Sequence, residues 1–314
     1  QTVLPPVLTG RPDFGVVVGI DDDGTVVIGA DGDRGYPGAV AAGSVYVFNG
    51  TTGALIATLK NPDVAAGTGF ASFYTVAISG RRVIVGAPFE SVHRSNGTII
   101  PDAGVAYVFN SRTGALLATL TSPDPQPGGN FGRGVDIQSH RVLVGETGDA
   151  FLTVPPGSRR IVGQAMHERY GVPYAPHPGR GFLFNVRTGE LLQSFKASDT
   201  ADDLNFFSCK INGETVVAGA PFAEPSNPSN LALNEGAVYV FSIRTGELLV
   251  TLAGTAHQQD DWVGRTVAVA GDDIIFGAFP VSNFVPDSLR SDPATAGTVF
   301  EWRLKHLRDR DADK

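Results

Sequence analysis

Residues 76–120 read VAISGRRVIVGAPFESVHRSNGTIIPDAGVAYVFNSRTGALLATL, four short apolar runs separated by turn residues. VAI and VIVGA flank the residues Ser-Gly-Arg-Arg at 79–82, which predict a tight hairpin because glycine reaches the positive φ that short β-turns require. VAYVF is joined to ALLATL through residues 110–114, where Asn110 and Gly114 favour another turn. The stretch therefore predicts a four-stranded antiparallel meander of about 45 residues, a period typical of repeat architectures.

Five copies of this unit follow one another along the chain. Their predicted bounds are 14–69, 70–130, 131–205, 206–261 and 262–304. The fifth copy lacks a fourth apolar run, but residues 2–13 have the form of a fourth strand and its exit loop. Pro5 and Pro6 suit the outermost strand of a blade, because an edge tolerates a missing N–H. The sequence therefore predicts one all-β domain at 1–304, a five-bladed β-propeller of four-stranded antiparallel meanders closed by the N-terminal strand, and a charged, solvated tail at 305–314.

The composition argues against several classes of function. The 314 residues carry a net charge of −8, which disfavours binding to nucleic-acid phosphates or anionic lipid. No apolar run approaches the ~20 residues of a membrane span, so membrane insertion is not expected. The single cysteine, Cys209, cannot form an internal disulfide. It replaces a valine of the repeat, which favours a small buried side chain over a nucleophile.

Short motifs recur at the same place in successive units. They are Phe131-Gly132, Gly86-Ala87-Pro88, Gly219-Ala220-Pro221, the VYVF runs, and turns of Thr-Gly followed by Ala or Glu and then Leu. In these motifs the chain resembles the FG-GAP repeats of integrin α-subunit propellers and of many secreted bacterial proteins, over nearly its whole length. The resemblance implies a propeller fold and an extracellular or periplasmic location. For function it implies little, because propellers host binding modules, scaffolds and enzymes alike.

The FG-GAP resemblance raises the question of calcium, because integrin-like repeats carry a DxDxDG loop between their first and second strands. Among the five corresponding hairpins only residues 21–24, Asp-Asp-Asp-Gly, are rich in acids, and Thr25 and Val26 follow where the family loop has a further acid. Calcium takes about six to eight oxygen ligands, which a tight hairpin does not supply. We therefore expect plain turns, and neither a metal nor a cofactor.

The first strand of each unit alternates small and apolar residues. In the third and fourth units, Asp136 and Lys210 replace the Gly or Ala found at one of the small positions. Either charge would be costly to bury alone. We therefore expect an ion pair, direct or through water, near the central channel, and a role in fixing the strand register rather than in catalysis.

The residues Tyr74, Arg133 and Arg265 are aligned where the inner strands begin, and we expect them at the mouth of the channel. A guanidinium offers a fixed fork of hydrogen-bond donors, so these residues predict a site for an anion or a carboxylate. The alternative is that the arginines pair with loop acids such as Asp63 or Asp124.

The loops between the second and third strands vary most in length, and the longest lies in the third unit. Loops on a rigid scaffold are where binding surfaces are usually built. This loop gathers Arg and aromatic residues typical of interface hot spots, and it is the predicted partner-binding element. Its candidate contact residues are Arg159, Arg160, His167, Glu168, Arg169, Tyr170, Tyr174 and His177. The alternative is that the loop only plugs the funnel; no HExxH or other metal-ligand spacing is present.

No catalytic pattern is evident in the sequence. GxSxG, P-loop and Rossmann glycine patterns are absent from strand-to-helix contexts, and Asp136 is the one acid on an inner strand, which argues against paired-carboxylate glycoside hydrolysis. We therefore expect a non-catalytic binding module, an accessory or adhesion subunit that engages a protein partner through its loop-rich face. The alternatives are a carbohydrate-binding, lectin-like propeller and a hydrolase with its site in the central funnel.

Overall fold

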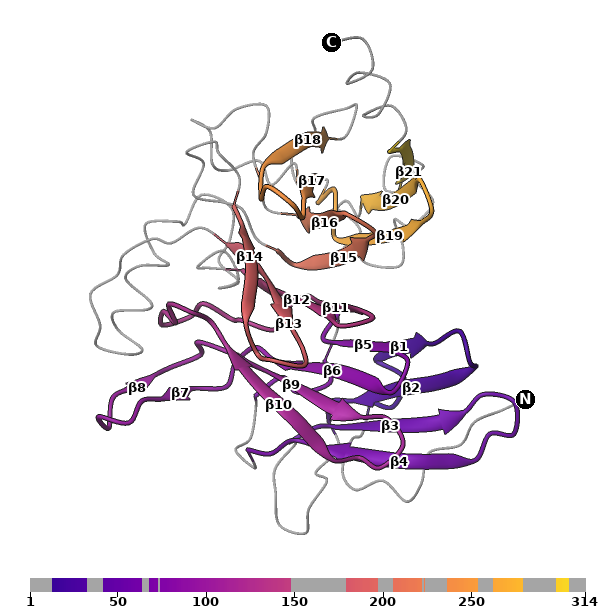
Figure 1. Ribbon diagram of the computed structural model, residues 1–314, viewed down its shortest axis with the longest axis vertical. Coiled ribbons are helices and arrows are strands. Elements are labelled where there is room, and N and C mark those ends of the chain that lie inside the picture. Colours follow the sequence, from indigo (N-terminus) through magenta and orange to yellow (C-terminus); the bar gives the residue numbers. More distant parts are fainter. Residues whose placement is uncertain are drawn as a thin grey trace, which may run out of the picture. The chain divides into compact units, whose positions relative to one another are not determined.

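Every regular element in the described part of the chain is a β-strand (Figure 1). The computed structural model describes residues 13–32, 42–63, 68–72, 74–147, 179–196, 206–221, 223, 236–253, 262–278 and 298–304. The chain divides into two compact units, each described by itself. The first comprises Gln1–Glu146 and Phe182–Leu192, and the second comprises Thr147–Gly181 and Gln193–Lys314.

The strands form the antiparallel meanders that the sequence predicts. The first sheet has the order β1 (Val17–Ile20), β2 (Thr25–Ala30), β3 (Ser44–Asn49) and β4 (Leu55–Lys60). The second sheet has the order β5 (Val76–Ser79), β6 (Arg82–Ala87), β9 (Val105–Asn110) and β10 (Leu116–Thr121). A separate two-stranded hairpin, β7 (Val92–His93) and β8 (Ile99–Ile100), lies between β6 and β9 in the chain.

The remaining sheets repeat this pattern. The third sheet comprises β11 (Val135–Gln138), β12 (Arg141–Glu146), β13 (Arg180–Asn185) and β14 (Leu191–Phe195). The fourth comprises β15 (Ser208–Asn212), β16 (Thr215–Ala220), β17 (Ala237–Ser242) and β18 (Leu248–Ala253). The fifth comprises β19 (Thr266–Ala270), β20 (Asp273–Ala278) and β21 (Thr298–Arg303). The prediction of all-β, four-stranded antiparallel sheets is confirmed; most of the predicted closing strand, residues 2–12, lies outside the described residues.

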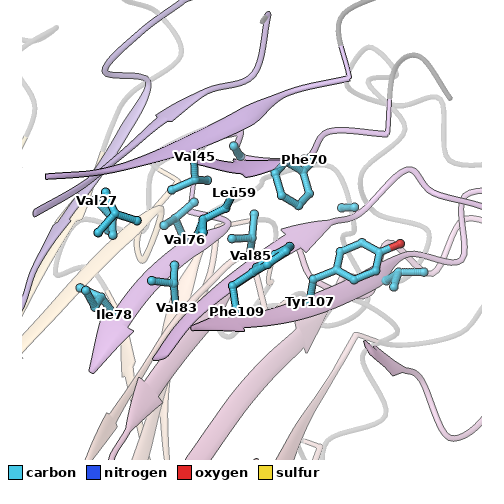
Figure 2. Close-up of a cluster of buried hydrophobic side chains, with 14 residues drawn as sticks. Val27, Val45, Leu59, Phe70, Val76, Ile78, Val83, Val85, Tyr107 and Phe109 are labelled. Carbon is cyan, nitrogen blue, oxygen red and sulfur yellow. The ribbon is translucent and has the colours of Figure 1, made fainter. Parts of the chain in front are cut away.

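Within each unit, sheets that follow one another in the chain pack face to face, because the strands alternate inward and outward side chains. In the first unit, Val27, Val45 and Val47 of the first sheet are fully buried. They form one core with the second sheet, including Val83 and Val85 (Figure 2). In the second unit, the fourth and fifth sheets share a core of the same kind, with these members: Val217, Val238, Val240, Val267, Ile274 and Phe276.

The Phe at the start of the first four repeats packs on aromatic residues of the third strand of its own sheet. The Phe70 ring lies 6.1 Å from the rings of Tyr107 and Phe109. Phe131 lies 6.0 Å from Phe182 and 6.1 Å from Phe184. Because each of these rings is large and buried, the aromatic trio accounts for the recurrence of both the initial Phe and the aromatic third strand.

The recurrent glycine near the end of the second strand serves the contact with the following repeat in the second and fourth sheets. A Cβ built on Gly86 would overlap the carbonyl oxygen of Gly132, and one built on Gly219 would overlap the carbonyl oxygen of Gly264. Both pairs lie within a single unit of the chain. Glycine is therefore required there because the backbones of successive sheets approach too closely for any side chain.

The aligned apolar positions of the inner strands are buried in most repeats but not in the first. Val76, Ile78, Val135 and Ile137 are at most 9% exposed. As expected, Cys209 is also buried, with 2% exposure. Their counterparts on β1 are exposed, Val18 to 65% and Ile20 to 71%. The exposure is limited to β1, because Ile28, Tyr46 and Phe48 on the same face of the first sheet are buried.

Candidate functional site

The loop between β6 and β9, residues 88–104, is a long second-to-third strand loop that the structure describes throughout. Its β7–β8 hairpin extends beyond the ends of β6 and β9 (Figure 1). At the turn, the Arg94 N–H donates to the Thr98 carbonyl at 2.9 Å and the Thr98 N–H donates to Asn96 Oδ1 at 3.0 Å. These hydrogen bonds make the hairpin an ordered projection from the second sheet.

The hairpin has one anchored face and one exposed face. Ile100 is 6% exposed, and Val92 is half-buried against the core shared by the first two sheets. His93 and Arg94 are exposed, and Ile99 is 57% exposed. The tip therefore presents a cation, an imidazole and an apolar side chain to solvent, a combination that suits contact with another macromolecule.

A buried acid lies at the base of this hairpin. Glu90 is 6% exposed, and its Oε1 accepts a hydrogen bond from the phenolic O–H of Tyr107 on β9. Its Oε2 is buried without a hydrogen-bond partner. Burial raises the pKa of Glu90 to about 7; the Tyr107 hydrogen bond opposes this and the nearby charge of Asp63 adds to it. Burial and the Glu90 contact also raise the pKa of the Tyr107 hydroxyl.

Sequence reasoning did not identify Glu90 or Tyr107 as functional candidates. Tyr107 occupies the aromatic position that Tyr46 and Tyr239 fill in other repeats, and Figure 2 shows its hydroxyl at the edge of the core cluster. Glu90 lies four residues after Gly86, and Asp33 and Asp149 lie at the same spacing after Gly29 and Gly145 in other repeats. The spacing therefore does not distinguish Glu90 in the sequence.

A second buried acid lies at the end of β12. Glu146 is fully buried, and its Oε2 accepts a hydrogen bond from Ser122 Oγ at 2.9 Å. Ser122 begins the exit loop of the second sheet and also receives the Asp124 N–H at 3.3 Å. Because Ser122 belongs to the preceding repeat, this hydrogen bond connects two successive repeats. It gives the buried carboxyl of Glu146 a structural role.

The three residues predicted at the channel mouth have different surroundings. Tyr74 has a φ of 65°, and its carbonyl accepts the Val135 N–H at 3.2 Å. Arg133 is buried, with 7% exposure. The Arg265 guanidinium lies over the rings of Trp262, at 4.9 Å, and Phe207, at 5.7 Å. Tyr74 and Arg133 belong to the first unit and Arg265 to the second, so a shared anion site stays a prediction.

The predicted channel ion pair has one member in each unit. Asp136 lies on β11 opposite Leu143, and Lys210 lies on β15 opposite Val217. Both side chains are half-buried, as expected for polar residues at the small positions of an inner strand. Their pairing stays a prediction because it would join the two units.

The predicted partner-binding residues of the third repeat lie outside the described residues. They are Arg159, Arg160, His167, Glu168, Arg169, Tyr170, Tyr174 and His177. The proposal that this loop is an interface therefore depends on experiment.

The acidic hairpin at residues 21–24 forms a turn. Asp23 Oδ1 accepts the Thr25 N–H at 2.9 Å, and hydrogen bonds from Thr25 lower the pKa of the Asp23 carboxyl. Asp23 Oδ2 lies 3.1 Å from the Arg112 guanidinium of the second sheet. Within the described ranges, no group of three or more His, Cys, Asp or Glu residues is arranged so that it could hold a metal ion. The same part of the chain contains no helix long and apolar enough to cross a membrane.

Comparison with known proteins rests on structure. No family model and no curated protein matches the sequence. Hydrazine synthase of Kuenenia stuttgartiensis is similar with a TM-score of 0.56 and 13% identity, over 97% of this chain and 66% of that one. The computationally designed Ika8 protein gives a TM-score of 0.47 and 18% identity, over 90% of this chain and 56% of that one.

BamB from Moraxella catarrhalis gives a TM-score of 0.39 and 14% identity, over 85% of this chain and 61% of that one. The chain thus spans less than two thirds of the length of each of these three proteins. The two lower TM-scores carry no conclusion. At 13% identity, the likeness to hydrazine synthase concerns the fold alone, and it supports a propeller-like arrangement of the sheets.

Proposed function

We propose that this protein is a non-catalytic binding scaffold, a five-bladed propeller of the FG-GAP type that engages a protein partner through its loop-rich face. The observation that carries the proposal is the β7–β8 hairpin, which holds exposed Arg94 and Ile99 on a rigid sheet. The FG-GAP resemblance favours an extracellular or periplasmic accessory or adhesion subunit. Such a protein needs a stable framework and variable loops, and no reactive centre.

The closed ring is part of this proposal. Val18 and Ile20 on β1 are exposed, whereas the equivalent side chains of the other described inner strands are mostly buried. Apolar side chains left in water are unfavourable at about 25 cal/mol per Å². Closure of the ring with the help of the N-terminal strand, residues 2–13, would cover these two side chains. The three-stranded form of the fifth sheet within the described residues is compatible with the addition of a fourth strand.

The close approach of successive repeats supports the role of scaffold. Gly86 against Gly132 and Gly219 against Gly264 leave no room for sliding between sheets. Loops carried on such a framework keep their spacing, which lowers the entropy cost of binding a partner. Different loop lengths in successive repeats favour one asymmetric protein interface over the repeated equivalent pockets that a lectin would use.

The test is capture of a partner by the purified full chain from an extracellular or periplasmic extract of the native source. Two variants address the proposed face: replacement of residues 159–177 by a short Gly-Ser loop, and Arg94→Glu combined with Ile99→Ser. The control is Arg187→Glu, because Arg187 lies in the hairpin between β13 and β14, at the opposite end of a sheet from the loops between second and third strands. We expect a defined partner that the control retains and at least one loop variant loses.

Two results would contradict the proposal. Equal capture by the wild type, both loop variants and the control would place the interface away from the loop-rich face. Binding to a glycan array without any protein partner, or turnover of a hydrolase substrate that Asp136→Asn abolishes, would favour the lectin or the hydrolase instead.

A further inference from the structure

Glu90 joins three segments of the first unit at the base of the β7–β8 hairpin. Its backbone N–H donates to the Ala87 carbonyl at 3.1 Å, and its carbonyl accepts the Gly104 N–H at 2.9 Å. Its side chain accepts the Tyr107 hydroxyl. The backbone and side chain of Glu90 therefore connect the end of β6, where the hairpin loop begins, with the segment that leads into β9, where the loop ends.

The neighbouring exit loop of the first sheet contacts the same point. The Phe89 N–H donates to the Thr68 carbonyl at 2.9 Å, which ties the foot of the hairpin to the segment before Phe70. Asp63, earlier in that exit loop, is the charged group that acts on Glu90. Its effect is repulsive for an ionised Glu90, so two carboxylates oppose one another across this junction.

The surroundings of Glu90 favour the protonated carboxyl. The side chain is 6% exposed and Oε2 has no donor, so an ionised Glu90 would leave a buried, partly unsatisfied charge. A neutral carboxyl avoids both the desolvation cost and the repulsion from Asp63. Burial raises the pKa of Glu90 to about 7, so the proton is retained or lost close to neutral pH.

We propose that Glu90 is a proton-linked clasp that holds the β7–β8 hairpin against the second sheet when it is protonated and loosens the hairpin when it is ionised. The device lies at the foot of the tip that bears His93, Arg94 and Ile99. Its consequence for partner binding rests on the proposed function, but the clasp itself does not. Its test therefore measures the opening of the hairpin in the absence of any partner.

The test is amide hydrogen exchange of the full chain at pH 6.0 and pH 8.5, expressed as protection factors corrected for the intrinsic pH dependence of exchange. The reporters are the Arg94 and Gly104 amides, both hydrogen-bonded in the hairpin and at its base. A carboxyl with a pKa of about 7 when the hairpin is closed and 4.5 when it is open predicts about a tenfold loss of protection over this range. The Gly53 amide, bonded to the Asn49 carbonyl in a hairpin at the other end of the first sheet, should not change.

Three variants connect the response to this site. Glu90→Gln keeps the shape and removes the charge, so the loss of protection should disappear. Asp63→Asn removes the repulsion and so lowers the pKa of Glu90 in the closed hairpin, and the loss of protection between pH 6.0 and pH 8.5 should become smaller. Glu190→Gln, at an exposed position of another hairpin, should behave as the wild type.

Two outcomes would overturn the clasp. Unchanged protection of Arg94 and Gly104 between pH 6.0 and pH 8.5 would show that ionisation of Glu90 does not open the hairpin. The second is a gain of protection on addition of Ca²⁺ alone at pH 8.5, present in the wild type and absent from Glu90→Gln. It would assign Glu90 and Asp63 to a cation site in place of a proton switch.

Discussion

Gly86 on β6 and Gly132 before β11 meet backbone to backbone, so that a Cβ on Gly86 would overlap the Gly132 carbonyl oxygen. Gly219 and Gly264 meet in the same way in the second unit. In these two pairs of repeats, the glycine of the second strand and a glycine just before the next inner strand are therefore two sides of one contact between successive repeats.

The substitution Gly86→Ala should destabilise the protein by about 3 kcal/mol or more, because the methyl group can be accommodated only by separating two backbones. The measurement is the free energy of unfolding from urea denaturation. Gly80→Ala is the control: Gly80 has a φ of 59° and open space around its Cβ position. Its cost should be about 1 kcal/mol, from the left-handed backbone alone. Equal costs at the two positions would contradict the close approach of the sheets.

The free energy of unfolding should fall as pH rises from about 4.5 to about 7, because of Glu90. The folded state keeps this proton up to a pKa of about 7, whereas the ordinary value is 4.5, so folding takes up a proton between these values. The stabilisation present at low pH is then lost as pH rises through this window, by about 3 kcal/mol.

The variant Glu90→Gln isolates this contribution. Its free energy of unfolding should match that of the wild type near pH 4.5 and exceed it by about 3 kcal/mol at pH 8.5. Urea denaturation at both pH values measures the difference. A constant difference between the two proteins across the whole pH range would mean that Glu90 does not titrate in this window.

The substitution Phe131→Ala should cost about 3–5 kcal/mol, since it opens a cavity in a fully buried position between Phe182 and Phe184. Phe131→Leu keeps most of the volume and should cost about 1.5 kcal/mol or less. Thermal or urea unfolding would measure the free energy of unfolding of both variants and so distinguish their costs. A loss below ~1 kcal/mol for the alanine variant would show that the aromatic trio is not what stabilises the start of a repeat.

The sequence was sufficient to predict the strands and their order within each sheet, because local signals determine both. Hairpins such as residues 79–82 carry their own turn glycine, and Gly80 has the positive φ that was expected. The spacing of the repeats then places each apolar strand next to its neighbour in the chain. Ring closure depends on a contact between distant repeats, which no local pattern encodes.

The candidate site was harder to predict than the fold. Asp136 and Lys210 are recognisable in the sequence because they break the alignment of the inner strands, but Glu90 lies in a loop of irregular length where repeats do not align. Its significance depends on burial and on the Tyr107 hydroxyl, which lies 17 residues further along the chain. Such a property emerges only when the loop is placed against the sheet.

The substitution Ile20→Lys tests whether the ring is closed. Ile20 is 71% exposed on β1, whereas its counterpart Ile78 on β5 is 9% exposed. If closure covers the first sheet, a lysine at position 20 would bury a charge and should cost at least about 2 kcal/mol, approaching the cost of Ile78→Lys.

Leu117→Lys is the matched control, since Leu117 is 49% exposed on the outer strand β10 and should tolerate the change within about 0.5 kcal/mol. Urea denaturation of the three variants gives the comparison. If Ile20→Lys is as neutral as Leu117→Lys, Ile20 is open to water in the folded protein and the closed five-bladed ring must be abandoned.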